Sequence, residues 1–486
     1  MQLTIKNYCM SKFLLKKTIY FFFLFLIFTN LAYSQTPDTT KSTMTPDTTM
    51  ANQVNISSKT NKGTQTTQSA EEYFYRAIDN AGWSNYIGAL RDFNRAIDLD
   101  STFADAYYLR GDAKSNLGDF NGAIRDFSKA TQLKAFDAQI FFDRALVYIN
   151  LRQFSAAFDD FTKSIELNPA SDRTYYTRGV MKHYILEDFP GAIEDYDQVI
   201  RLTPNDAEAH YNKALAQIKI GSFDEAKENF KKAYQFSPYN DEYFFAEKNL
   251  EIFMDSVKIY NSAIESNPRD ANAYTQRGKQ KVKVELYDSA IEDFNKAIEL
   301  NPNDAKAFLL RGNIKTMKGV FAEAIDDYNM AIAKAPTDPE MFFRRAALKH
   351  NFPKDYAGAI IDYNKAIELD EKNIYYILAR GDAKTISKKY KDAIEDYSKA
   401  IEIQPDNLTG YLKRGDAKYL NYDFEGAIED FSKVIELNPK EAIAYYKRGL
   451  AKHRIDKIVE ACEDLSLAGE YGYTEVYKVI KIYCSN

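Results

Sequence analysis

Residues 426–452 read GAIEDFSKVIELNPKEAIAYYKRGLAK, and variants of this stretch recur along most of the chain. The recurrence is easiest to follow at the residue before the small residue of each unit's first helix. Twelve such positions follow one another at a nearly constant spacing: Arg76, Arg110, Arg144, Arg178, Lys213, Glu247, Arg277, Arg311, Arg345, Arg380, Arg414 and Arg448. A period of roughly 34 residues indicates a stack of duplicated units.

Each unit reads as a helical hairpin. Apolar and small residues recur three and four positions apart, as at Ala324, Tyr328 and Ala331, which is the spacing of one face of a helix. Proline has no N–H and a fixed φ, so it ends one helix and lets the next begin. Eight units close on such a residue: Pro169, Pro204, Pro238, Pro268, Pro302, Pro336, Pro405 and Pro439.

The order small residue, twelve residues, alanine, aromatic, alanine and proline resembles the tetratricopeptide repeat from about Glu71 to the C-terminus. Seven units have glycine where that family places a small residue that lets two helices approach: Gly111, Gly179, Gly278, Gly312, Gly381, Gly415 and Gly449. The resemblance implies an all-α, right-handed superhelical solenoid of twelve hairpins over 71–471, with first helices lining its concave groove. A capping helix is expected over 472–486.

The sixth unit, 239–268, is four residues short around Phe253 and Met254 and has Glu247 in place of arginine. Its helices or its turn must therefore be truncated. We expect the curvature of the solenoid to change at this unit, between five repeats before it and six after it.

Residues 1–34 have the order of a secretory signal peptide. Four lysines precede an apolar run from Ile19 to Phe28, and the small-residue exit Ala32-Tyr33-Ser34 predicts cleavage after Ser34. The alternative is a membrane anchor, but the run is shorter than the ~20 residues needed to span a bilayer. We expect export from a bacterial cell, to the periplasm, the cell envelope or the medium, with no stable transmembrane span after cleavage.

Residues 35–70 are rich in Thr, Ser, Asn and Gln and lack an apolar period, which predicts a disordered linker. TPDTT occurs twice, and its Asp-Thr-Thr triplets resemble O-glycosylation sites of Bacteroidetes secreted proteins. Thr39 and Thr48 are the possible acceptors, and a plain solvated linker is the alternative. Signal removal takes the formal net charge from −6 to about −10, which disfavours nucleic acid as a partner.

Only Cys462 and Cys484 remain after cleavage. The last second helix rises about eight residues beyond Cys462, and the chain returns about nine residues to Cys484, so two legs of roughly 12 to 14 Å bring the sulfurs together. In an oxidising compartment we predict a disulfide that holds the capping helix. Two free buried thiols are the alternative.

Acidic pairs and histidines are the first candidates for chemistry. The pairs recur once per unit, as Glu194-Asp195, Glu292-Asp293, Asp326-Asp327, Glu395-Asp396 and Glu429-Asp430. Each Asp follows the unit's Arg by sixteen or seventeen positions, which indicates structural Arg–Asp pairs and not a single catalytic site. His183, His350 and His453 share one first-helix position but lie in different repeats, too far apart to share a metal. We interpret them as packing beside turns.

No hydrolase, zinc-protease, P-loop or dinucleotide motif is present, so we expect no catalytic residue, metal or cofactor.

In the family that the sequence resembles, ligand contacts concentrate on first helices, at positions that include the one two residues before the repeat's Arg. Here that position is aromatic in eight units, and this row comprises Phe74, Tyr108, Phe142, Tyr176, Tyr211, Phe245, Phe343 and Tyr446. Aromatic side chains suit recognition of a protein or extended peptide. The alternative is that the rings pack on the next first helix. The Lys and Asn pattern of chaperone-tail binding is missing.

These features favour an exported, non-catalytic scaffold that binds a protein or extended peptide in its groove. The first rival is a structural or assembly factor of the cell envelope that uses its convex or end surfaces. The second is a carbohydrate-binding subunit that uses the aromatic row for stacking.

Overall fold

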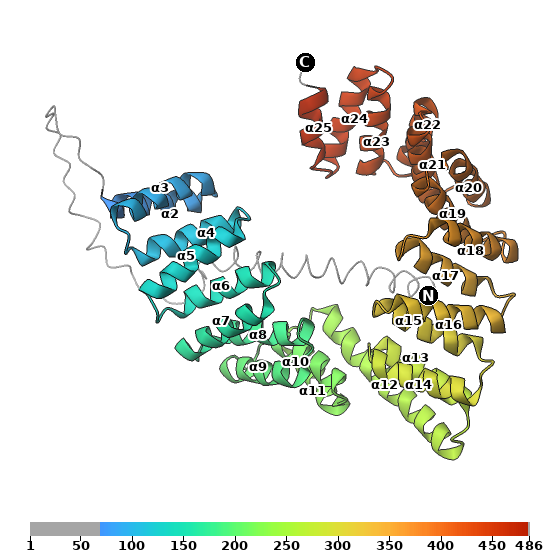
Figure 1. Ribbon diagram of the computed structural model, residues 1–486, viewed down its shortest axis with the longest axis horizontal. Helices are drawn as coiled ribbons and strands as arrows, with labels where there is room; N and C mark the ends of the chain where they lie inside the picture. Colours follow the sequence, from blue (N-terminus) through green and yellow to red (C-terminus); the bar gives the residue numbers. More distant parts are fainter. Residues whose placement is uncertain (1–68, 485–486) are drawn as a thin grey trace. The chain divides into compact units, whose positions relative to one another are not determined.

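The computed structural model describes residues 69–484, which form twenty-four helices, α2 to α25, and no strand (Figure 1). The predicted all-α fold is confirmed. The chain divides into two compact units, Met1–Asn249 and Leu250–Asn486, called unit 1 and unit 2 below. Within the described part, no helix is long and apolar enough to cross a membrane. The expected signal peptide, Thr39, Thr48 and nearly all of the expected linker lie outside the described residues.

Unit 1 contains five helical hairpins. They are α2 (Ala70–Gly82) with α3 (Tyr86–Leu99), α4 (Ala104–Asn116) with α5 (Phe120–Leu133), α6 (Ala138–Asn150) with α7 (Phe154–Leu167), α8 (Asp172–Tyr184) with α9 (Phe189–Leu202), and α10 (Ala207–Lys219) with α11 (Phe223–Phe236).

Unit 2 contains six hairpins and a terminal helix. They are α13 (Ala271–Lys283) with α14 (Tyr287–Leu300), α15 (Ala305–Met317) with α16 (Phe321–Lys334), α17 (Pro339–Asn351) with α18 (Tyr356–Leu369), α19 (Ile374–Ile386) with α20 (Tyr390–Ile403), α21 (Leu408–Leu420) with α22 (Phe424–Leu437), and α23 (Ala442–His453) with α24 (Ile458–Glu470), then α25 (Val476–Tyr483).

The α4–α5 hairpin shows how the sequence specifies the repeat. Its first helix has 13 residues and its second has 14. In the turn, Gly118 has φ of 80°, a left-handed conformation that glycine adopts without a Cβ penalty. Asp119 then caps α5, because its carboxylate accepts the Gly122 N–H at 2.9 Å. The turn residues therefore end one helix and begin the next within three positions.

Small residues let the paired helices touch. Ala123, Phe127 and Ala130 of α5 are at most 1% exposed. A Cβ added at Gly415 would lie 2.6 Å from Cε1 of Phe431, closer than any real contact. The predicted close-packing role of this glycine is confirmed.

An arginine fork joins the two helices of ten hairpins. In each, the guanidinium of the first helix binds a buried carboxylate of the second, as Arg144 Nε and Nη2 donate to Asp160 at 2.7 Å each. The ten pairs are Arg76–Asp92, Arg110–Asp126, Arg144–Asp160, Arg178–Asp195, Arg277–Asp293, Arg311–Asp327, Arg345–Asp362, Arg380–Asp396, Arg414–Asp430 and Arg448–Asp464. The structural interpretation of the acidic pairs is confirmed.

The same fork also reaches the preceding repeat. Nη1 of Arg144 donates to Ser128 of α5 at 3.0 Å, sixteen positions back, and Nη1 of Arg311 donates to Asn295 at 2.6 Å in the same way. The guanidinium also lies over the aromatic ring three positions earlier, 5.4 Å from the centroid for Phe141. The arginine therefore links its own helix to two others, the second helix of its hairpin and the second helix of the preceding repeat.

The fifth hairpin replaces the fork by a neutral network. Asn229 stands where the other hairpins have the buried Asp, and its amide contacts His210 Nδ1 at 2.8 Å and Gln217 Oε1 at 2.9 Å. Lys213, in the arginine position, keeps only the link to the preceding repeat, through Asp197 at 2.5 Å.

The sixth unit is one continuous helix, α12 (Asp241–Ser266), of 26 residues. Since a hairpin elsewhere has helices of 13 and 14 residues, the shortening corresponds to the turn and one helical residue. The expected truncation therefore removes the turn, and eleven of the twelve repeats are hairpins. The boundary between unit 1 and unit 2 falls within α12. The expected change of curvature stays a prediction.

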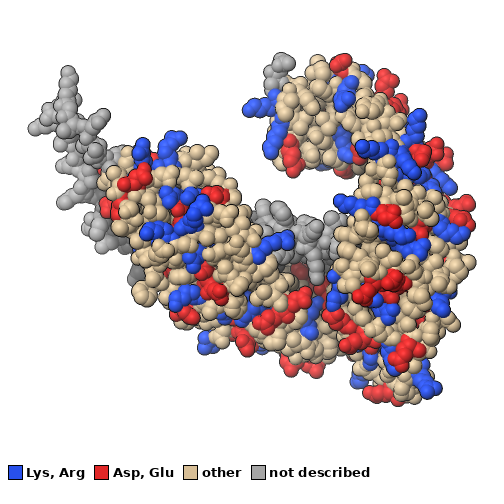
Figure 2. Space-filling model, viewed as in Figure 1, with Lys and Arg blue, Asp and Glu red and all other residues tan. Residues whose placement is uncertain are grey.

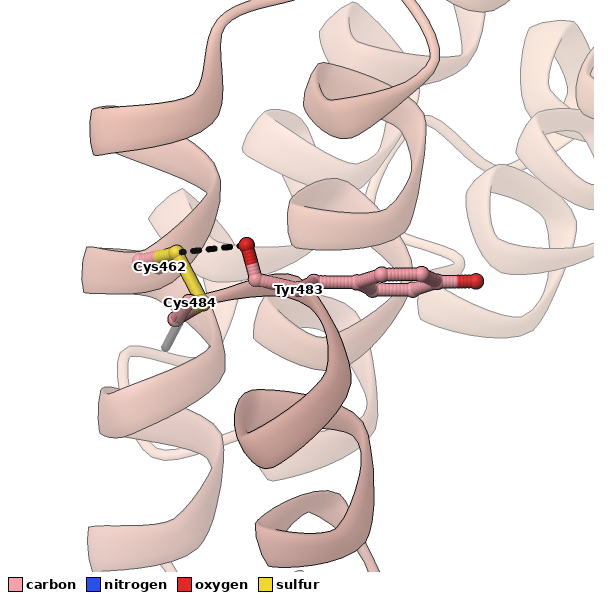
Figure 3. Close-up of a disulfide and its surroundings, with 3 residues drawn as sticks. All are labelled: Cys462, Tyr483 and Cys484. Carbon is pink, nitrogen blue, oxygen red and sulfur yellow. Dashed lines mark hydrogen bonds between the residues drawn. A yellow bond between two sulfur atoms is a disulfide. The ribbon is translucent and has the colours of Figure 1, made fainter. Parts of the chain in front are cut away.

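The C-terminal helix α25 covers the end of the last hairpin. Val476 is fully buried among Tyr445, Leu465 and Ala468. Cys462 of α24 and Cys484 form a disulfide (Figure 3). Their Cα atoms lie 5.8 Å apart. The bond expected from the sequence is thus present, and it joins the end of the cap to the middle of α24.

Replacing Asp396 by Asn tests the fork, because the change leaves the Arg380 and Lys384 cations without their shared buried anion. We expect the local free energy of unfolding to fall by about 3 to 5 kcal/mol, measured as faster amide hydrogen exchange in α19 and α20. Glu395→Gln is the matched control, since Glu395 is the neighbour in the same acidic pair and is less buried. Equal effects of the two changes would contradict a structural fork.

Replacing Cys484 by Ser should release α25. For a loop of this size the free energy of unfolding should fall by about 3 kcal/mol. The loss should be confined to α24 and α25, where amide hydrogen exchange should become faster. Adding a dithiol to the wild-type protein should reproduce it. Alkylation of the denatured, unreduced protein should label neither cysteine, and labelling of both would refute the bond.

Candidate partner-binding surface

The aromatic row packs mainly inside the hairpins. Each of six rings contacts the large aromatic of its own second helix, at centroid distances of 5.4 to 6.1 Å: Phe74–Phe93, Tyr108–Phe127, Phe142–Phe161, Tyr176–Tyr196, Tyr211–Phe230 and Phe343–Tyr363. Phe142 is only 3% exposed.

Phe74 makes a further ring contact, and the other two members of the row differ in exposure. Phe74 contacts Phe103 at 4.6 Å, and Tyr446 contacts Tyr473 at 4.7 Å. Phe245, in α12, is 57% exposed. For most of the row, therefore, the ring contributes to packing within its own hairpin.

The tyrosine hydroxyls of the row connect successive first helices. Tyr108 donates to Asp143 Oδ2 at 2.6 Å, and Tyr211 donates to Glu242 Oε1 at 2.8 Å. Tyr176 accepts from Asn212 Nδ2 at 3.0 Å. These bonds order the first-helix surface of unit 1, because each ties one repeat to the next.

Asp112 and Asp143 form an unusual pair on this surface. In unit 2, the position of Asp112 is held by Asp382 and Asp416, and each binds a lysine of the next first helix: Lys413 at 2.8 Å and Lys447 at 2.5 Å. The residue that corresponds to these lysines in the repeat after Asp112 is Asp143. One junction of unit 1, between α4 and α6, therefore places two acids where two junctions of unit 2 place an ion pair, and among the described residues neither acid has a cation within 4.0 Å.

The pKa values reflect this arrangement. Desolvation, and then the charge of Asp143, raise the pKa of Asp112 to about 6. Desolvation also raises the pKa of Asp143, while its hydrogen bonds from Tyr108 and Gln139 and the charge of Arg173 oppose the shift. The Asp112 side chain stays exposed to solvent. It is thus an accessible carboxylate beside a second negative charge.

Sequence reasoning missed this pair of acids. The signal that could have found it is the relation of Asp382 to Lys413 and of Asp416 to Lys447, which recurs at the same spacing in two repeats. Applied to Asp112, that spacing leads to Asp143.

The three histidines contact aromatic rings. His183 packs edge-on against Phe189 at 5.5 Å, and His350 against Tyr356 at 5.5 Å, both at the first residue of the following helix. His453 stacks on Tyr483 at 4.1 Å. The packing interpretation is confirmed for His183 and His350, while His453 contacts the capping helix. In residues 69–484, no group of three or more His, Cys, Asp or Glu side chains is arranged to hold a metal.

Charges of both signs are mixed over the face drawn in Figure 2. Lys and Arg side chains lie beside Asp and Glu in both units, and neither sign forms a continuous stripe on that face.

Family comparisons agree with this architecture. Models of the TPR, or tetratricopeptide, repeat match residues 104–137, 138–171, 182–221, 207–240, 275–339, 381–421 and 423–456. Together these ranges cover more than half of the 486 residues. Stacked helical hairpins define a solenoid repeat protein, and this chain belongs to the tetratricopeptide repeat family.

Several solved structures are similar to the chain. One is YrrB, described as a TPR protein with an unusual peptide-binding site, with 22% identity over 38% of this chain and 95% of that one and a TM-score of 0.35. The C-terminal part of a TPR repeat-containing protein from Cytophaga hutchinsonii has 20% identity over 48% and 96% of the chains, with a TM-score of 0.43. Yeast Tom70 has 15% identity over 85% and 98%, with a TM-score of 0.33. No curated protein matches the sequence significantly.

Asp112→Asn tests the like-charge pair through its pH dependence. The folded state has the higher pKa at Asp112, so ionisation destabilises the fold at pH 7, and this destabilisation is lost as the pH falls from about 6 to the ordinary aspartate value of 3.8. The Asn variant should therefore be more stable than wild type at pH 7, by less than about 1 kcal/mol because the group is exposed, and the difference should shrink as the pH is lowered. Thermal unfolding measures this, with Asp98→Asn as an exposed control. A constant difference across this range would contradict the pairing.

Proposed function

We propose that this chain is an exported, non-catalytic scaffold that binds a protein or extended peptide along its first-helix surface. In unit 1, the Asp112–Asp143 pair takes a lysine or arginine side chain of the partner. We call the place of these two side chains the cation slot. The observation that supports this proposal most is that the corresponding place at two junctions of unit 2 holds an Asp–Lys pair.

The Lys413–Asp382 contact supplies the geometry of recognition. A lysine amine at that place binds both oxygens of Asp382, at 2.8 and 2.9 Å. A partner's cation at the corresponding place in unit 1 would neutralise two carboxylates whose proximity otherwise opposes folding. Charge-assisted hydrogen bonds of this kind contribute about 1.5 to 3 kcal/mol, enough to make the cation a specificity determinant.

Binding should depend on pH in a definite direction. A cation favours the ionised form of Asp112, so the partner must displace the proton when the pH lies below the free-state pKa of about 6. Affinity should therefore fall as pH decreases through this value.

Export and lack of catalysis rest on separate observations. The N-terminal lysines and apolar run are typical of a signal peptide, and the Cys462–Cys484 disulfide suits an oxidising compartment. Tetratricopeptide repeat proteins are generally non-catalytic scaffolds, and the buried acids of this chain are engaged by structural forks.

A photo-crosslinking side chain tests the surface in living cells. It is placed at Asn116, exposed on α4 one turn from Asp112, or at Lys129, on the second helix α5. We expect partner capture from position 116 only. Capture from position 129 alone would favour the envelope-assembly rival, in which second-helix surfaces make the contacts.

Asp112→Lys sharpens the experiment. The new amine should pair with Asp143, with the two charges in the reverse order from unit 2, so the fold is retained while capture from position 116 falls about tenfold or more. Asp98→Lys makes the same charge change on a second helix and should leave capture unchanged. Undiminished capture by the Asp112 variant would refute the cation slot. Alanine at Tyr108, Phe142 or Tyr176 is a poorer probe, because those rings support the hairpins.

A further inference from the structure

The first helix of unit 1 leaves its stacking side uncovered. In the described part of the chain no repeat precedes α2, which lies at the end of the unit 1 stack (Figure 1). The side chain of its fork residue, Arg76, is 47% exposed, whereas those of the other nine fork arginines are 14 to 20% exposed. The side of α2 that corresponds to a repeat contact elsewhere is therefore open to solvent.

This side of α2 combines acids with a large aromatic ring. Three positions after the unit's arginine, nine other hairpins bury an apolar side chain, as Ala113 does against Phe93 of the preceding repeat. In α2 this position is Asp79, which is exposed, as is Glu72 one position before Tyr73. Tyr75, one turn from Asp79, is 64% exposed. We call Glu72, Tyr75 and Asp79 the α2 end face.

The last helix of unit 2 presents the opposite charge. Val476 of α25 is buried against the last hairpin, so the far side of the helix faces solvent. That side comprises Tyr477, Lys478, Lys481 and Ile482, all exposed, and the eight residues of the helix include no acid. Ile482 is 75% exposed. We call these four residues the α25 end face.

A requirement for solubility explains only part of this composition. The terminal units of a solenoid need a polar outer surface, because nothing stacks on them. The acids of α2 and the lysines of α25 satisfy that need. It does not explain why the two ends differ in sign, nor why Tyr75, Tyr477 and Ile482 are exposed among the charges. Apolar groups flanked by complementary charges are instead typical of a contact surface.

The charges select which end meets which. Two copies joined through α2 would bring Glu72 and Asp79 close to their own counterparts, and two copies joined through α25 would do the same with Lys478 and Lys481. Like charges in a contact disfavour it. Only the pairing of one α2 end face with one α25 end face brings acids to lysines and lets the exposed apolar side chains meet.

We propose that the α25 end face of one chain docks on the α2 end face of a second copy, so that chains associate head to tail. Such a contact is heterologous, and it adds further chains in a row unless the row closes into a ring. Because it involves one helix face from each copy, the contact should be weak and sensitive to salt. None of its residues belongs to the cation slot, so self-association and partner binding are independent proposals.

Sedimentation velocity of the full-length chain tests the association. At chain concentrations from about 10 μM to 1 mM, a range that detects weak binding, the weight-average mass should rise above that of the monomer. It should fall again as salt is added, because screening weakens contacts between exposed charges. A monomer at every concentration, or an association that salt does not weaken, would overturn the proposal.

Charge reversal at each end tests the orientation. Asp79→Lys alters the α2 end face and Lys478→Glu alters the α25 end face, and each should weaken self-association about tenfold or more. An equimolar mixture of the two variants should recover association. The reason is that the unaltered α25 end face of the Asp79 variant can dock on the unaltered α2 end face of the Lys478 variant.

Matched controls reverse charges in the middle of unit 1. Lys129→Glu on α5 and Asp159→Lys on α7 change exposed residues away from both end faces and should associate as wild type. Thermal unfolding checks that all four variants are folded. Weakening by only one end-face variant, or a mixture that stays monomeric, would refute the head-to-tail contact, since either result requires that association use a different surface.

Discussion

The arginine fork is the contact on which the rest of the structure depends. A single guanidinium binds the Asp of its own hairpin and a polar side chain of the preceding repeat, as Arg144 does with Asp160 and Ser128. A buried ion pair contributes little net stability, but its planar, bidentate geometry accepts one arrangement of donors and acceptors. The fork therefore acts through geometry: it sets the spacing of the paired helices and the register between repeats, and the small residues then allow the close contact.

The repeats that lack the fork are adjacent in the chain. The fifth hairpin has the neutral network of His210, Asn229 and Gln217, and the sixth unit has Glu247 and the continuous helix α12. The boundary between the two compact units falls in the second of them. Loss of the fork and loss of the turn thus coincide with the place where the regular repeat pattern is interrupted.

The fold could be predicted from the sequence much further than the candidate site. Helical hairpins, close-packing glycines, Arg–Asp pairs and the Cys462–Cys484 bond all follow from signals that are local or repeated many times. The aromatic row was correctly placed on first helices, but most of its rings turn out to contact an aromatic ring of the second helix, as Phe142 does with Phe161. The Asp112–Asp143 pair was missed because it is an exception at one junction, and repetition gives no signal for a single exception.

By itself, the sequence determined the period, the helical pairing and the residues that hold each hairpin, because these depend on spacing within a single repeat. Tertiary structure decided what depends on contact between repeats. It showed that Nη1 of the fork's arginine binds a side chain of the preceding repeat. It also showed that deletion of a turn fuses two helices into α12, and that Asp382 and Lys413 of successive first helices form an ion pair. The physical reason is that stacking sets these distances, and stacking emerges only when all the hairpins pack together.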